Sequence, residues 1–201
     1  MLKKRRPRID HDERRIAILR SGARVFLEKG LRGATMDDVA AELNLSKGLI
    51  YRQFSSKDDL IAAIFEEVLA VLARLKVEPW GGYHAGTVGT IAAARENPEA
   101  FLLLYRECRG DPVYRIHASQ LEELYVDWLM RFFEDQKGQS SKEARRAEMA
   151  VRNLTGFLFE ALSNWLTEGD AAEDPIFAAW IGDIIKSWRR STIAHWNLPD
   201  I

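Results

Sequence analysis

Apolar residues recur every three to four positions along most of the chain, which is the period of an amphipathic helix. Glycine, proline and asparagine interrupt this pattern between the helices that it predicts. The predicted helices span about residues 12–29, 36–43, 47–54, 56–76, 86–96, 98–108, 112–136, 141–168 and 175–196. No alternating run of β-branched residues in the sequence argues for a strand. The pattern therefore predicts an all-α fold of about nine helices.

Residues 35–57 contain two short predicted helices that are joined by a tight turn at residues 44–46. Thr35 and Ser46 precede the two helices, and a side-chain oxygen at that position can accept an otherwise unpaired backbone N–H. Two short helices joined in this way are typical of helix-turn-helix domains, in which the second helix enters the DNA major groove. We therefore expect a three-helix DNA-binding domain over residues 10–56.

The second short helix separates buried from exposed positions. Ile50 and Phe54 lie four residues apart and can anchor the helix to a core. The opposite side can read DNA, because Gln53 can bond adenine at two atoms and Lys47 or Arg52 can bond guanine or phosphate. These side chains alone would also suit an ordinary solvated surface, so the pattern around them decides between the two interpretations.

This stretch resembles the DNA-binding domain of the TetR family of bacterial transcriptional regulators over about residues 14–61. The residues that carry the resemblance are Ala23, Phe26, Gly30, Thr35, Val39, Ala40, Leu45, Ser46, Gly48, Tyr51, Phe54, Lys57 and Leu60. Two positions depart from the family pattern: Gln53 stands where histidine or tyrosine is commoner, and Leu49 stands where threonine or a small residue is commoner. Both departures bear on base selection more than on the fold.

The resemblance also implies which positions would bind double-stranded operator DNA. Thr35, Tyr51 and Lys57 would hold phosphates, as a tyrosine hydroxyl or a cation at a helix N-terminus commonly does. Residues of the second short helix would face the bases or the groove wall. The expected DNA-binding residues are Thr35, Ser46, Lys47, Gly48, Leu49, Tyr51, Arg52, Gln53 and Lys57.

The distribution of charge favours a nucleic-acid contact at one end of the chain. Residues 1–60 carry a net charge of +5 (14 Lys/Arg, 9 Asp/Glu), whereas the remainder carries −6 (15 Lys/Arg, 21 Asp/Glu). We expect residues 1–9 to be a flexible basic arm, which either lies in a neighbouring minor groove or is an ordinary solvated charge run. We expect three parts: this arm, the DNA-binding domain, and a ligand-sensing and dimerisation domain over residues 57–201.

The helices predicted at 141–168 and 175–196 are apolar over a wide arc, about 200° in the first of them. A helix on the surface of a monomer needs only about half of that arc. The simplest consequence is a two-fold homodimer, to which the family resemblance also points; the alternative is two helices fully buried in one protomer. The expected interface residues are Phe159, Leu162, Leu166, Phe177, Trp180, Ile181, Ile184 and Trp188.

Aromatic residues cluster between residues 101 and 165. Each of them can be ordinary core, but the family resemblance implies a ligand cavity between the middle helices. A cluster of this kind suits an apolar or aromatic small molecule as the effector. The expected ligand-contacting residues are Phe101, Tyr105, Tyr125, Trp128, Phe132, Phe157 and Trp165.

The rest of the sequence offers no catalytic or metal-binding pattern. The single cysteine, Cys108, excludes an internal disulfide, and the histidines are scattered without a second ligand at metal-binding spacing. No secretory signal and no membrane-spanning run is recognised. We therefore expect a cytoplasmic, ligand-responsive repressor that has no enzymatic activity, metal or cofactor. A small all-helical enzyme and a helical adaptor that binds only protein are the alternatives.

Overall fold

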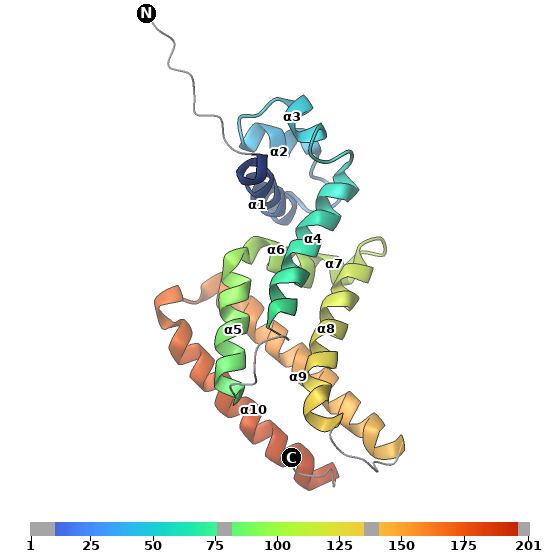
Figure 1. Cartoon of the computed structure of the whole chain (residues 1–201), viewed down its shortest axis with the longest axis vertical. Helices are drawn as coiled ribbons and strands as arrows, with labels where there is room; N and C mark the ends of the chain where they lie inside the picture. Colours follow the sequence, from blue (N-terminus) through green and yellow to red (C-terminus); the bar gives the residue numbers. More distant parts are fainter. Residues whose placement is uncertain (1–10, 76–81, 135–140, 197–201) are drawn as a thin grey trace, which may run out of the picture. The chain divides into compact units, whose positions relative to one another are not determined.

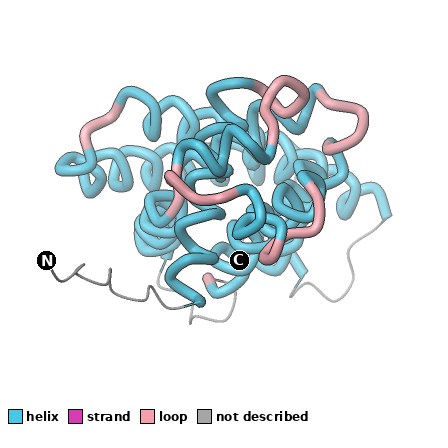
Figure 2. Tube along the Cα trace, turned by 90° about the horizontal axis from the view of Figure 1, so that it is seen from above, coloured by secondary structure: helices cyan, strands magenta, loops and turns pink. Residues whose placement is uncertain are grey.

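A computed structural model of the chain describes residues 11–75, 82–134 and 141–196 (Figure 1). Each of these residues lies in a helix, a turn or a loop (Figure 2). With the continuous helical run 98–110 counted as one, the described residues form nine α-helices, which confirms the expected all-α fold. The basic arm expected at residues 1–9 lies outside the described residues.

The chain divides into two compact units, Met1–Glu66 and Glu67–Ile201. The division falls inside the fourth helix, α4 (Lys57–Arg74), so this helix contributes residues to both units. The functional boundary expected between residues 56 and 57 stays a prediction. The other helices of the first unit are α1 (His11–Lys29), α2 (Met36–Glu42) and α3 (Lys47–Tyr51).

The core of the first unit forms where α1 and α4 approach each other closely. Phe26 of α1 and Leu60 and Ile64 of α4 are completely buried. Between them lies Gly22, where a Cβ atom would come within 3.2 Å of the Leu60 and Ile64 side chains. Glycine therefore permits this packing distance, and α3 adds the fully buried Ile50 to the same unit.

The second unit is a helical bundle that the chain enters within α4. Its further elements are α5 (Gly82–Glu96), α6 (Pro98–Leu102), the π-helical turn η1 (Leu103–Glu107), α7 (Cys108–Gly110), α8 (Arg115–Glu134), α9 (Ser141–Glu168), the 3₁₀ turn η2 (Ala171–Glu173) and α10 (Asp174–Trp196). Within this bundle α10 packs along α5, and α8 packs along α9 (Figure 1). A Cβ atom at Gly182 of α10 would lie 3.4 Å from the His84 backbone of α5, so these two helices are in close contact.

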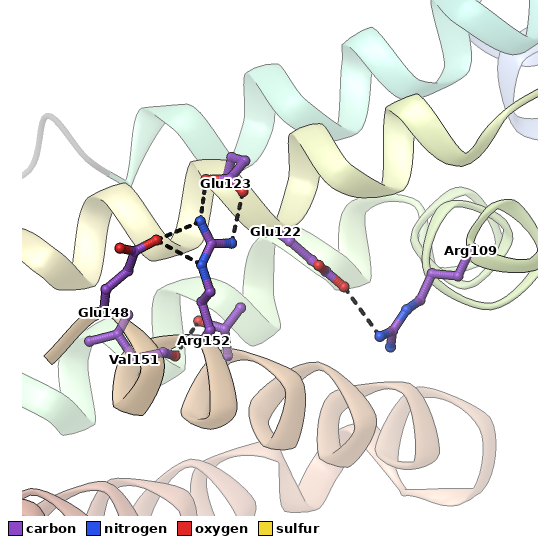
Figure 3. Close-up of polar contacts among 7 residues, drawn as sticks. Arg109, Glu122, Glu123, Glu148, Val151 and Arg152 are labelled. Carbon is purple, nitrogen blue, oxygen red and sulfur yellow. Dashed lines mark hydrogen bonds and ion pairs between the residues drawn. The ribbon is translucent and has the colours of Figure 1, made fainter. Parts of the chain in front are cut away.

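Charged side chains join α7, α8 and α9 at the surface of the bundle. Arg152 of α9 binds Glu123 of α8 at 2.8 Å and Glu148, one turn earlier on α9, at 3.0 Å (Figure 3). Arg109 of α7 binds Glu122 of α8 at 3.4 Å. All five side chains are about one-third to one-half exposed, so each pair contributes at most about 1 kcal/mol to stability.

A more buried polar contact joins α5, α9 and α10 where two of them end and the third begins. Arg95, near the end of α5, binds Asp174, the first residue of α10, at 2.9 Å. The indole Nε1 of Trp165 on α9 donates to the same carboxylate at 2.7 Å. The hydrogen bonds from Arg95, and then that from Trp165, lower the pKa of Asp174. The carboxylate therefore stays ionised and fixes the three helices at this end of the bundle.

Candidate DNA-binding surface and ligand pocket

The start of α2 is fixed by a complete capping box. The backbone N–H of Asp38 donates to Oγ1 of Thr35 at 3.2 Å, and the backbone N–H of Thr35 donates to the Asp38 carboxylate at 2.8 Å. Hydrogen bonds from Lys29, and then from Thr35, lower the pKa of Asp38 to about 2. The predicted cap at Thr35 is confirmed, and Thr35 itself lies exposed at the surface.

The turn between α2 and α3 is tight and contains Asn44 in the left-handed backbone conformation. Asn44 has a positive φ of 52°, which asparagine adopts more readily than most residues. The backbone N–H of Leu45 donates to the carbonyl of Ala40 at 2.9 Å and closes the turn. The predicted side-chain cap at Ser46 is wrong, because its hydroxyl makes no capping hydrogen bond and only its carbonyl accepts, from Leu49 at 2.9 Å.

Residues 46–54, which contain α3 and are called the α3 segment below, have one buried side and one exposed side, as their sequence predicts. Ile50 and Phe54 are buried in the first unit, and Leu49 and Gln53 are half-buried. The exposed residues are Ser46, Lys47, Gly48, Tyr51 and Arg52. A Cβ atom at Gly48 would meet nothing within 4 Å, so the backbone is open to a close approach from outside. The exposed side thus combines cations, a phenol and accessible backbone.

Two of the expected phosphate- or base-binding cations also hold contacts inside the unit. Nζ of Lys47 binds the carboxylate of Asp37 on α2 at 2.9 Å, and this ion pair raises the pKa of Lys47. Nζ of Lys57 donates to the carbonyl oxygen of Ala34 at 2.7 Å and lies 5.8 Å from the centre of the Phe26 ring. Sequence reasoning found both lysines but missed these partners, because each partner comes from a different helix or loop.

The second unit contains a small apolar cavity of about 40 Å³ between α5, α8, α9 and α10. Two expected ligand-contacting residues of α8, Tyr125 and Trp128, line it. The described lining residues are Tyr83, Gly86, Thr87, Thr90, Ile91, Tyr125, Trp128, Leu129, Leu158, Phe159, Leu162, Phe177, Ile181 and Ile185. None of these side chains is charged, so the cavity suits an uncharged ligand.

Comparison with known proteins agrees with this arrangement. The family model for bacterial regulatory proteins of the tetR family matches residues 18–64. The HTH-type transcriptional repressor AcnR of Corynebacterium glutamicum is 28% identical over 160 residues, which cover 75% of this chain and 78% of that protein. Residues 18–64 belong to the TetR family of DNA-binding domains, and most of the chain is similar to an HTH-type transcriptional repressor.

Solved structures of transcriptional regulators resemble the fold of most of the chain. A TetR-like transcriptional regulator from Rhodococcus sp. RHA1 superposes with a TM-score of 0.71 at 17% identity, over 94% of this chain and 100% of that one. The transcriptional regulator FadR from Bacillus subtilis, whose crystal structure is a complex with stearoyl-CoA, superposes with a TM-score of 0.62 at 12% identity. That match covers 85% of this chain and 96% of that one.

Three of the remaining expected ligand-contacting residues, Phe101, Tyr105 and Trp165, do not line the cavity but pack against residues that do. Phe101 and Tyr105 are buried against Phe159, each with its ring centre 5.8 Å from that ring. Trp165 stacks on Phe177 with ring centres 4.4 Å apart, and Phe157 is 42% exposed on α9. The side chain of Phe132 lies outside the described part of α8. Their roles in ligand binding stay predictions.

The expected interface residues divide between the inside and the outside of the protomer. Those buried within the protomer are Phe159, Leu162, Phe177 and Ile181. Leu166, Ile184 and Trp188 are half-buried, and Trp180 is 54% exposed. The exposed large apolar residues of α9 and α10 are Met149, Phe157, Ile176 and Trp180. The expectation of a dimer on α9 and α10 therefore rests on the outward-facing residues.

The structure also describes the surroundings of Cys108, the possible metal ligands and the helices that could span a membrane. Burial raises the pKa of the Cys108 thiol to about 12, so this cysteine is an ordinary core residue in the described unit. Within the described ranges, no group of three or more His, Cys, Asp or Glu side chains is gathered where it could bind a metal ion. None of the helices in those ranges has the length and apolar character that a membrane span needs.

Proposed function

We propose that this chain is a homodimeric TetR-family repressor that reads a palindromic operator with α3 and leaves the DNA when a small molecule enters the second unit. The observation that carries the DNA-binding part is the two-sided α3 segment. Its buried residues hold it in the first unit, and its exposed residues include Lys47, Tyr51 and Arg52. A recognition helix needs this division, because base contacts must not disturb the core.

Phosphate contacts on either side of α3 would fix its register on the duplex. Thr35 is exposed at the capped start of α2, and Lys57 at the start of α4 is bonded to Ala34, the residue before Thr35. Two helix N-termini therefore lie close together in the first unit, and the cation of Lys57 at one of them suits a phosphate. The expected arm at residues 1–9 would add a minor-groove contact.

The cavity supports the ligand-responsive part of the proposal. Its volume of about 40 Å³ is well below the roughly 150 Å³ of a cavity that holds benzene. An effector of that size or larger must move the walls, which are four different helices. A ligand that requires a changed arrangement binds one conformation better than the other, and this difference in affinity is what shifts the population. The FadR relative, solved with stearoyl-CoA, supports a ligand site in a fold of this kind.

Selection from randomised duplex DNA tests the proposed function. The full-length protein should enrich a palindrome whose half-sites are about one helical turn, or 34–36 Å, apart or a multiple of that distance. A variant that carries Arg52→Ala and Gln53→Ala serves as the matched control and should lose the enrichment while keeping its helical circular dichroism spectrum. No enriched sequence with the wild-type protein would contradict the proposal.

A further inference from the structure

The cavity of the second unit contains a directed chain of hydroxyl groups in otherwise apolar surroundings. Oγ1 of Thr90 donates to the carbonyl oxygen of Gly86, one turn earlier on α5, at 2.9 Å. The same Thr90 oxygen is hydrogen-bonded to the phenol oxygen of Tyr125 on α8. A carbonyl oxygen can only accept, so the Thr90 proton points to Gly86. Tyr125 must therefore donate its proton to Thr90.

This direction decides what Tyr125 can offer to a ligand. Its proton is used by Thr90, and its oxygen keeps a lone pair that can accept a further hydrogen bond. Thr87, one helical turn from Thr90 on the cavity side, also donates its hydroxyl proton to a backbone carbonyl, that of Tyr83, at 2.8 Å. Thr87 and Tyr125 therefore have no hydroxyl proton left for a ligand, and toward a ligand their oxygens can only accept.

We propose that the effector is an uncharged, largely apolar molecule with one hydroxyl or N–H donor, and that the phenol oxygen of Tyr125 accepts a hydrogen bond from that donor. The proposal rests on the proposed function for the existence of an effector and adds its chemical class. Apart from Gly86 and the two threonines, the described lining residues are aliphatic or aromatic, so a ligand gains mainly by burying apolar surface.

Charged molecules are disfavoured at this site for a separate reason. The described lining contains no lysine, arginine or histidine to pair with an anion and no carboxylate to pair with a cation. Burying an unpaired charge is far more costly than burying a neutral polar group. Tyr125 does not supply the missing charge, because its burial raises the pKa of its phenol and keeps it protonated near neutral pH.

Isothermal titration calorimetry with four naphthalene derivatives tests the proposal on the full-length protein. 2-Naphthol carries a donor, 2-methylnaphthalene has the same size without one, 2-methoxynaphthalene carries only an acceptor, and 2-naphthoate is an anion. Wild-type protein should bind 2-naphthol about five- to tenfold more tightly than the methyl or methoxy compound, the value of one neutral hydrogen bond. It should bind 2-naphthoate at least about a hundredfold more weakly.

Three variants test which side-chain hydroxyls produce the preference for 2-naphthol. Tyr125→Phe should remove the advantage of 2-naphthol over 2-methylnaphthalene. Tyr114→Phe is the control, because Tyr114 is a half-buried tyrosine of the second unit that does not line the cavity. Thr90→Val leaves the Tyr125 proton without its acceptor, so affinity for 2-methoxynaphthalene should rise about five- to tenfold. A purely structural role for Thr90 would not produce this gain.

The outcomes separate this proposal from the proposed function. Equal affinity for 2-naphthol and 2-naphthoate, no binding of any neutral probe, or an unchanged preference in a folded Tyr125→Phe protein would overturn the assignment of the effector class. If Tyr125→Phe does not fold, the rise in affinity expected for Thr90→Val decides in its place. Probes that bind with the expected preferences but do not release operator DNA would support the ligand class and contradict the repressor mechanism.

Discussion

Nζ of Lys57, the first residue of α4, donates a hydrogen bond of 2.7 Å to the carbonyl oxygen of Ala34, the residue before the α2 cap. This contact joins the starts of two helices that are 23 residues apart in the chain. Lysine has three donors, so Nζ can keep this bond and still bind a phosphate. Lys57 therefore has a structural role in addition to the DNA contact that the sequence predicts.

Replacing Lys57 separates the two roles. Lys57→Ala should lower the free energy of unfolding by about 1 kcal/mol, because the part-buried carbonyl of Ala34 loses its partner. It should also weaken binding to all DNA sequences and reduce the slope of log affinity against log salt by about one. Lys186→Ala is the control for the lost charge, since Lys186 pairs with Asp183 in the second unit. A lower stability with an unchanged salt slope would leave Lys57 without a phosphate contact.

Removing the partner of Lys47 should strengthen DNA binding. Asp37 neutralises Lys47 at a distance of 2.9 Å beside the expected recognition helix, and its negative charge repels phosphates. Asp37→Asn should raise affinity for specific and non-specific DNA about three- to tenfold at low salt. Fluorescence anisotropy measures this, with Asp183→Asn as the matched control. Unchanged affinity at low salt would show that Lys47 and Asp37 lie away from the DNA.

Gln53 tests direct reading of a base. Its side chain is half-buried beside the exposed residues of α3, and a bidentate contact with adenine is worth about 1–3 kcal/mol of discrimination. Gln53→Ala should therefore relax the preference at one base pair of each half-site in a selection from randomised DNA. Identical preferences for the two proteins would show that Gln53 reads no base.

Trp180 offers a test of dimerisation that leaves the protomer intact. Its side chain is 54% exposed on α10, so Trp180→Glu should not unfold the unit. If α10 packs against its two-fold mate, the new carboxylate is buried without a partner and the dimer dissociates. Light scattering should then give the mass of one chain, and operator affinity should fall with it. Ala179→Glu, at an exposed position about 100° away on the helix, should remain a dimer. A dimeric Trp180→Glu protein would place the interface elsewhere.

The sequence predicted the helices closely, because their apolar periodicity and their breaks are local properties. The helix expected at 141–168 is observed as Ser141–Glu168, and the cap at Thr35 is present. The π-helical turn Leu103–Glu107, inside a helix expected at 98–108, was not predicted, since residue spacing does not reveal such a local change of register. The missing cap at Ser46 likewise depends on a side-chain rotation that sequence does not fix.

The candidate sites were only partly predictable, because sequence does not tell which side of a wide apolar arc faces inward. Phe157 and Phe159 both belong to the apolar arc of α9 in the sequence, yet the first is 42% exposed and the second is buried beside the cavity. Thr87 and Thr90 were missed for a different reason. Threonine on a helix gives no distinctive pattern, and its importance here comes from Tyr125, which lies 35 residues from Thr90 in the chain.

The most direct test is the binding of wild-type protein to the selected operator, measured by fluorescence anisotropy on a duplex with both half-sites and on one with a single half-site scrambled. We predict that the intact palindrome binds two protomers and that scrambling one half-site weakens binding by at least about a hundredfold. Once one DNA-binding domain of the dimer is bound, the second is held at a high effective concentration near its half-site. Equal affinity for the two duplexes, or for an unrelated sequence, would contradict a dimeric operator-reading regulator.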